Sequence, residues 1–138
     1  MTRFYLAGPM SNIPQFNFPL FISAAADIRG RGIDLVSPAE LDAENGIDKQ
    51  ATSSTDGDAS KLSSTWAELL ARDVKIVADQ VQGIIFLPNW HKSRGARLEA
   101  FVGLLQKDFE FMAYKGEALP LDPVDREDVL GAIYLEMI

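Results

Sequence analysis

The feature that constrains the fold most is an uninterrupted apolar run at residues 83–87, followed by the polar stretch PNWHKSRGARLE at residues 88–99. Four apolar residues then recur with helical spacing: Leu98, Phe101, Val102 and Leu105. A short apolar run is typical of a strand buried on both faces, and the spacing after it predicts a helix to about residue 107. A buried strand, a polar loop and a helix form the unit with which α/β proteins build ligand sites at strand ends.

Apolar runs and helical stripes alternate along the rest of the chain. We expect strands at residues 3–7, 33–36, 83–87 and 109–114, and helices that begin near Asn17, Thr65, Ser93 and Asp122. Alternating strands and helices favour βαβ units. We therefore predict one α/β domain over residues 1–138, with a doubly wound, mostly parallel sheet of four to five strands flanked by helices, which is the flavodoxin-like or Rossmann-like class.

Two of the expected helices carry details that bear on function. Residues 65–68 read Thr-Trp-Ala-Glu, which is a capping box at a helix start. The last helix has an apolar stripe made of Val129, Leu130, Ile133, Tyr134 and Met137. Between the second and third strands, residues 39–63 show no periodicity and are rich in Asp, Ser, Thr and Gly. We expect a flexible acidic loop there, either a functional lid or a disordered segment.

Composition excludes several functions. The chain has no cysteine, which excludes thiol catalysis and thiolate metal ligands, and its single histidine excludes a multi-histidine metal centre, so we expect no metal and no cofactor. A net charge of −7 argues against broad nucleic-acid binding. No apolar run approaches the roughly 20 residues of a membrane span, and the amino-terminal apolar stretch is too short for a signal peptide. We expect a soluble, cytoplasmic protein without a membrane partner.

Three polar side chains are candidates for chemistry: Tyr5, Asp73 and Glu99. Asp73 falls on the apolar face of its helix, between Leu69 and Val77, where an unpaired carboxylate is costly. Either it serves a site or it caps or pairs with a neighbouring loop. Two nearby carboxyl groups are the minimum apparatus for cleaving a glycosidic bond, one as nucleophile and one as proton donor. A tyrosine hydroxyl can hold the nucleophile in line.

The loop before Glu99 has features of an anion site. Ser93 is a plausible N-cap, and Gly95 leaves the first helical turn open, so backbone N–H groups and the helix dipole favour an anion there. Lys92 and Arg94 flank this position. An ordinary helix start remains the alternative. Trp90 either stacks on a base or covers the sheet edge, and His91 reads as a surface residue.

Three motifs in order resemble the nucleoside 2-deoxyribosyltransferase superfamily. They are YLAGPM at residues 5–10, Asp73 followed by KIVAD and a buried strand, and SRGARLE at residues 93–99. The chain is most similar to the small phage and bacterial members and to the nucleoside 5′-monophosphate N-glycosidases. The likeness covers most of residues 3–114.

The resemblance implies roles for these residues. Glu99 would be the nucleophile that forms a covalent ribosyl intermediate, Asp73 the acid that assists departure of the base, and Tyr5 the group that orients Glu99. The substrate-binding residues would be Ala7, Gly8, Pro9, Met10, Asn89, Trp90, Ser93, Arg94 and Gly95. The family also implies a homodimer or larger homo-oligomer whose neighbouring subunit helps to close the pocket.

Position 93 bears on the substrate. Relatives that use free nucleosides carry an aspartate there, and monophosphate hydrolases carry a serine. A carboxylate would repel a 5′-phosphate, whereas Ser93 would accept it. We therefore expect an enzyme that hydrolyses the base–sugar bond of a (2′-deoxy)nucleoside 5′-monophosphate.

The loop at residues 11–15 lacks the arginine with which some such hydrolases bind phosphate. Base exchange by a deoxyribosyltransferase and an inactive nucleotide-binding module are the alternatives, and the sequence does not identify the base.

Overall fold

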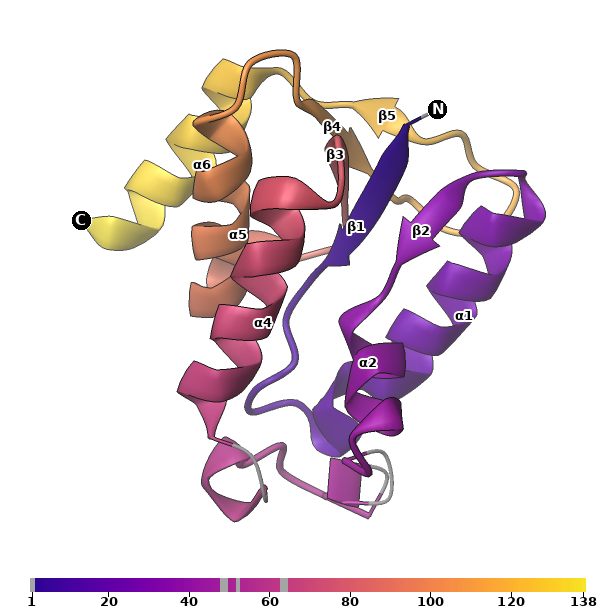
Figure 1. Ribbon diagram of the computed structural model, residues 1–138, viewed down its shortest axis with the longest axis vertical. Coiled ribbons are helices and arrows are strands. Elements are labelled where there is room, and N and C mark those ends of the chain that lie inside the picture. Colours follow the sequence, from indigo (N-terminus) through magenta and orange to yellow (C-terminus); the bar gives the residue numbers. More distant parts are fainter. Residues whose placement is uncertain (1, 48–49, 52, 63–64) are drawn as a thin grey trace.

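The central sheet has five strands in the order β2-β1-β3-β4-β5. The computed structural model describes residues 2–47, 50–51, 53–62 and 65–138 (Figure 1). The strands are β1 (Arg3–Ala7), β2 (Asp34–Val36), β3 (Gly83–Phe86), β4 (Glu110–Ala113) and β5 (Asp122–Pro123). β1 to β4 are parallel, and β5 is antiparallel to β4. The predicted fold class is confirmed: a mostly parallel, doubly wound α/β sheet.

Helices cover both faces of this sheet (Figure 1). The α-helices are α1 (Phe18–Gly30), α2 (Pro38–Glu44), α4 (Trp66–Asp79), α5 (Arg94–Leu104) and α6 (Arg126–Met137). Short 3-10 turns lie at η1 (Pro14–Asn17), η2 (Ala59–Lys61) and η3 (Trp90–Lys92). α1 packs on one face, and α4, α5 and α6 pack on the other. No helix in the described ranges is long and apolar enough to cross a membrane.

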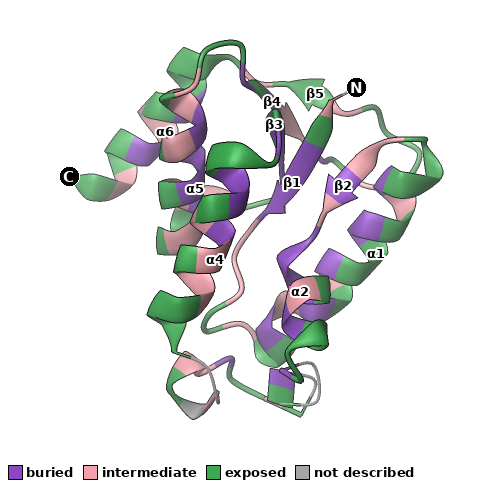
Figure 2. Ribbon diagram, in the orientation of Figure 1, coloured by how far each residue is buried: buried purple, intermediate pink, exposed green. Residues whose placement is uncertain are grey.

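β1 is buried along most of its length (Figure 2). Its side chains alternate between the two faces of the sheet and so divide the core. Phe4 and Leu6 join the cluster under α1, while Tyr5 and Ala7 join the cluster under α4, α5 and α6. This alternation follows from the two-residue period of a strand. It places the buried Tyr5 ring on the same side of the sheet as α4 and α5.

The strand order creates a crevice at the carboxyl ends of β1 and β3. β2 lies on one side of β1 and β3 on the other, so the loops that leave β1 and β3 diverge there. Ligands of doubly wound folds bind at such a switch point. Both YLAGPM and SRGARLE lie at these strand ends.

The expected flexible loop at 39–63 is wrong in its first part, because residues 38–44 form α2. Pro38 at the first helical position favours this start, and seven residues are too few to display a repeated apolar stripe. Asp42, Ile47 and Ala51 are buried. Positions 48, 49, 52, 63 and 64 of the expected loop lie outside the described residues.

The expected start of the last helix at Asp122 is also wrong. Asp122 and Pro123 form the edge strand β5, and α6 begins at Arg126. Proline lacks an N–H group, so it is tolerated on a sheet edge. The next residue restores the ladder, since the Val124 N–H donates to the carbonyl of Phe111.

The inward face of α5 differs from the stripe that the spacing indicated. Its buried residues are Ala96, Glu99, Ala100 and Gly103. A Cβ at Gly103 would stand 2.7 Å from the Phe109 ring, so this glycine permits the close approach of the helix. The larger residues point outward: Leu98 is 41%, Phe101 44% and Leu105 71% exposed.

The expected stripe of α6 is confirmed only in part. Leu130, Tyr134 and Met137 are exposed on α6, where only Val129 and Ile133 are buried. On α1, Phe18, Phe21, Ala25 and Ile28 are buried and Ile22 is exposed. α5 also ends at Leu104, earlier than expected.

Candidate active site

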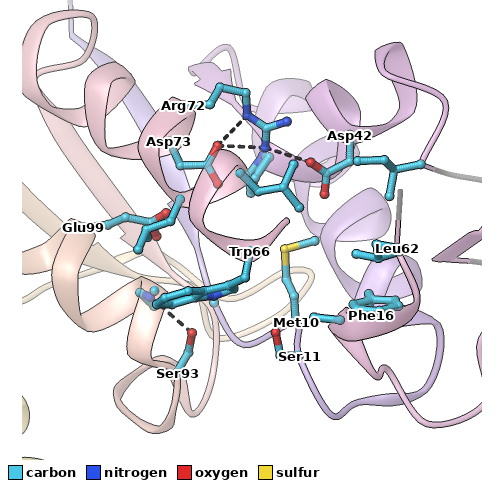
Figure 3. A pocket seen from close by; sticks show the side chains of 18 of the residues that line it. Met10, Ser11, Phe16, Asp42, Leu62, Trp66, Arg72, Asp73, Ser93 and Glu99 are labelled. Carbon is cyan, nitrogen blue, oxygen red and sulfur yellow. Dashed lines mark hydrogen bonds and ion pairs between the residues drawn. The ribbon is translucent and has the colours of Figure 1, made fainter. Parts of the chain in front are cut away.

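A cleft opens at the carboxyl ends of β1 and β3, between α4, α5 and the loop that follows β1 (Figure 3). The empty space inside it, with the open solvent at its entrance included, is about 690 Å³. Its lining residues come from segments spread between positions 5 and 99: Tyr5, Gly8, Met10, Ser11, Phe16, Phe18, Pro38, Asp42, Ile47, Ala59, Leu62, Trp66, Leu69, Leu70, Arg72, Asp73, Ser93, Gly95, Ala96 and Glu99. All three candidate catalytic residues are among them.

Tyr5 and Glu99 form the most buried polar contact of the cleft. The Tyr5 hydroxyl donates a hydrogen bond of 2.8 Å to Oε2 of Glu99. Burial raises the pKa of Glu99 well above its ordinary value, the charge of Asp73 raises it further, and the hydrogen bond from Tyr5 opposes both. Burial likewise raises the pKa of Tyr5, so Tyr5 stays a hydrogen-bond donor.

Asp73 lies on the inward face of α4, as its position among apolar residues indicated. Its Oδ1 accepts a hydrogen bond of 2.8 Å from Nε of Arg72. The partner therefore comes from the same helix and not from a neighbouring loop. Burial raises the pKa of Asp73 to about 6, while the Arg72 charge acts in the opposite direction.

This arrangement suits proton transfer combined with nucleophilic attack. Two carboxyl groups that face one buried cleft resist being ionised together, so one tends to hold a proton while the other is charged. A protonated acid beside a carboxylate supplies the two groups needed to break a glycosidic bond. In the described ranges no group of three His, Asp or Glu residues is placed to hold a metal ion.

Ser93 and Gly95 line the cleft at the amino-terminal end of α5. The Ser93 hydroxyl accepts a hydrogen bond of 3.2 Å from the N–H of Ala96, which confirms it as the N-cap. Its own O–H remains able to donate. A Cβ at Gly95 would lie 3.7 Å from Leu70 and 3.9 Å from the Ser93 hydroxyl, so the protein itself leaves room there.

Five expected binding residues do not line the cleft: Ala7, Pro9, Asn89, Trp90 and Arg94. Trp90 stacks on Phe86 with ring centroids 4.0 Å apart and covers the sheet. Lys92 does not line the cleft either, and its Nζ lies 3.3 Å from a carboxylate oxygen of Glu136 on α6. His91 is half-exposed beside the same glutamate, 3.8 Å away, as a surface residue would be.

Residues that line the cleft but were not among the expected site residues include Trp66, Asp42 and Arg72. The sequence places Trp66 in the capping box of α4, yet its side chain is 37% exposed and lines the cleft. The Arg94 guanidinium lies 4.4 Å from the centre of its ring. Asp42 lay in a segment expected to be a loop. Nothing in the sequence indicated that Arg72 lines a site, because an arginine beside an aspartate is common on helices.

The fold and the cleft together define an α/β domain that has a buried carboxyl pair at its topological switch point. Residues 2–107 match the family model described as Domain of unknown function (DUF4406), so the chain belongs to that family. No curated protein matches the sequence, and no solved structure matches it.

Proposed function

We propose that the protein is an N-glycosidase that hydrolyses the base–sugar bond of a (2′-deoxy)nucleoside 5′-monophosphate and releases the free base and the sugar phosphate. The observation that carries this proposal is the buried Tyr5–Glu99 hydrogen bond beside Asp73 in one cleft. The resemblance of the three motifs to deoxyribosyltransferases and monophosphate N-glycosidases supports it.

The chemistry proceeds by double displacement. A Glu99 carboxylate oxygen attacks the anomeric carbon while the bond to the base nitrogen breaks, and the bonding electrons leave with the base. Asp73 gives its proton to that nitrogen. Water, deprotonated by the Asp73 carboxylate, then attacks the anomeric carbon, which frees Glu99 and returns the proton to Asp73. The positive charge that develops on the sugar favours the ionised form of Glu99 against its raised pKa.

A phosphorylated substrate suits the part of the cleft at the amino-terminal end of α5. The Ser93 O–H and the first N–H groups of α5 are donors there, and no acidic side chain stands at that position. Trp66 offers an apolar ring near the same end, and Met10, Phe16 and Leu62 add apolar contacts suited to a base. Base exchange, with a second base in place of water, is the runner-up.

The test is release of free base from a panel of ribo- and deoxyribomononucleotides and the matching nucleosides, followed by chromatography. We expect turnover of at least one monophosphate, faster than of its nucleoside, and loss of turnover in Glu99→Gln. A slow substrate should leave a sugar-phosphate adduct on Glu99 that intact-protein mass spectrometry detects. A new nucleotide formed when a second base is supplied would favour exchange. No turnover of any compound, together with binding of nucleotides, would favour the inactive binding module.

We also propose that the protein forms a homodimer through the outer faces of α5 and α6. The groove between these helices, termed the α5/α6 groove, is lined by Arg94, Arg97, Leu98, Phe101, Leu130, Ile133, Tyr134 and Met137. After its charged first turn, α6 carries apolar residues on its inner and its outer side, and an apolar helix surface of this kind is normally covered.

Charge favours a second copy as the occupant of the α5/α6 groove. α5 and α6 run antiparallel, as two contacts between their ends show. Lys92, just before α5, forms an ion pair with Glu136 near the end of α6. Arg126 at the start of α6 donates a hydrogen bond to the carbonyl of Leu104 at the end of α5. Arg94 and Arg97 therefore mark one end of the groove, and the acidic first turn of α6 marks the other. A two-fold axis across the groove would bring basic ends against acidic ends.

Sedimentation or light scattering tests the dimer. The wild-type protein should have twice the chain mass, and Phe101→Asp should be monomeric. Ile22→Asp, at an exposed apolar residue on α1, is the matched control and should stay dimeric. A monomeric wild-type protein at tens of micromolar would contradict the proposal.

A further inference from the structure

Arg72 lies between two buried carboxyl groups that come from different helices (Figure 3). Its Nε and Nη2 are each 2.8 Å from Oδ1 of Asp73, and Nη2 is also 2.8 Å from Oδ1 of Asp42. The three side chains are largely covered, with exposed fractions of 22% for Arg72, 7% for Asp42 and 11% for Asp73. The contact to Asp42 is an ion pair and lacks the angles of a well-directed hydrogen bond.

The contact between Arg72 and Asp73 does not follow from the helix alone. Consecutive residues on a helix point in different directions, so Arg72 has to fold across to reach its neighbour. Asp42 provides a reason, because it reaches Arg72 from α2 and holds the guanidinium beside the cleft. A buried ion pair contributes little net stability compared with apolar residues of similar size. Its position at the cleft therefore favours a role in the chemistry.

We propose that Arg72, held by Asp42, is a positioning residue for Asp73: it fixes the carboxyl group inside the cleft and controls whether that group carries a proton. The catalytic consequence depends on the proposed function, since it requires Asp73 to protonate the leaving base. The electrostatic part concerns three side chains of the folded protein and can be measured without any substrate.

Four groups face Asp73 and determine its protonation: Arg72 on α4, Asp42 on α2, Tyr5 on β1 and Glu99 on α5. The positive charge of Arg72 lowers the pKa of Asp73, and the negative charge of Asp42 raises it. Asp42 also shares Nη2 of Arg72 with Asp73. Removal of Arg72 and removal of Asp42 must therefore shift the titration of Asp73 in opposite directions.

The experiment combines a carboxyl titration with kinetics. Carbon-13 NMR of the aspartate carboxyl groups follows the titration of Asp73 in the wild type, Arg72→Gln, Arg72→Lys and Asp42→Asn. The Asp73 signal is assigned by its loss in Asp73→Asn. An arginine beside a carboxyl group shifts its pKa by about one unit or more. We expect the Asp73 midpoint to rise by about one pH unit in Arg72→Gln, to fall in Asp42→Asn and to stay near the wild-type value in Arg72→Lys.

The pH dependence of kcat should shift in the same direction as the Asp73 midpoint in each variant. Because Asp73 acts as an acid, activity is lost as pH rises through its pKa, so the basic limb of kcat should move to higher pH in Arg72→Gln and to lower pH in Asp42→Asn. At pH values low enough for Asp73 to be protonated in both proteins, we expect kcat of Arg72→Gln to be roughly tenfold below that of the wild type with KM nearly unchanged, since positioning is lost. Arg72→Lys should retain part of the kcat that Arg72→Gln loses. Circular dichroism checks that each variant folds.

Three outcomes separate this inference from the proposed function. Opposite midpoint shifts with parallel kinetic shifts support both. Opposite midpoint shifts without turnover of any nucleotide support the control of Asp73 by Arg72 and overturn the glycosidase. Midpoints that stay unchanged, or that move in the same direction, overturn the inference whatever the activity. If Arg72→Gln does not fold, Asp42→Asn and Arg72→Lys decide, because both keep the positive charge.

Discussion

The Tyr5 hydroxyl donates a 2.8 Å hydrogen bond to Glu99, although the two residues are 94 positions apart in the sequence. Tyr5 is fully buried and Glu99 is 6% exposed. A strand from the start of the chain and a helix from its last third thus meet at one pair of oxygen atoms. The bond favours the ionised form of Glu99, which is the form needed for attack on a sugar.

Tyr5→Phe tests this relationship. Loss of the hydrogen bond should raise the pKa of Glu99 further, so the acid limb of kcat/KM should move to higher pH and activity at neutral pH should fall about ten- to a hundredfold. The free energy of unfolding should fall by about 1 kcal/mol. A pH–rate profile and urea denaturation measure both. An unmoved acid limb would show that Tyr5 only fills space.

Asp73→Asn should change how stability depends on pH. The pKa of Asp73 rises from 3.8 to about 6 on folding, so the native state holds a proton that the unfolded chain has released. Stability should therefore fall as pH rises from about 4 to about 6, by on the order of 2 kcal/mol from this group. Asp73→Asn should remove that part of the fall. Asp79→Asn, at an exposed position on the same helix, is the control; an unchanged fall in Asp73→Asn would contradict the raised pKa.

The two tryptophans allow a test of where ligand binds. Trp66 lines the cleft, whereas Trp90 stacks on Phe86 outside it. The chain contains no other tryptophan. Nucleotide binding should therefore quench fluorescence in Trp90→Phe, which retains Trp66, and should leave the fluorescence of Trp66→Phe nearly unchanged. The reverse pattern would place the base near Trp90.

Gly95→Ala should separate stability from binding. A methyl group there meets only ordinary contacts with the protein, and alanine is favoured over glycine in a helix by up to about 1 kcal/mol. The variant should melt at a higher temperature. The same methyl group enters the lining of the cleft, so KM for a mononucleotide should rise several-fold while kcat changes less. Gly131→Ala on α6, where a Cβ meets no atom within 4 Å, is the control for helix propensity alone. An unchanged KM would place the substrate away from this turn.

Local patterns were sufficient for much of the fold. The strand at Arg3–Ala7, the capping box at Thr65 and the N-cap at Ser93 were all predicted from residues adjacent in the chain, and all are confirmed. The burial of Asp73 was predicted as well, because a helical period fixes which residues share a face. Local rules failed at α2 and β5, where a short helix and a two-residue edge strand carry almost no periodic signal.

The faces of α5 and α6 could not be read from spacing alone. Apolar spacing predicts that a helix has an apolar side but does not identify which surface covers it. On α5 the small residues Ala96, Ala100 and Gly103 pack against the sheet, and Leu98 and Phe101 point away. The choice depends on how closely the helix can approach the sheet, which Gly103 of α5 and the facing Phe109 ring determine together.

The sequence by itself determined the α/β class, the order of most elements and the three polar groups Tyr5, Asp73 and Glu99, because each rests on a short periodic pattern or on a motif. Only the tertiary structure decided which residues share the cleft. Trp66 lines the cleft and Trp90 does not. Lys92 contacts Glu136 of α6, and Asp42 contacts Arg72. Contacts between residues distant in the chain depend on the packing of whole helices against the sheet, and no local pattern encodes that packing.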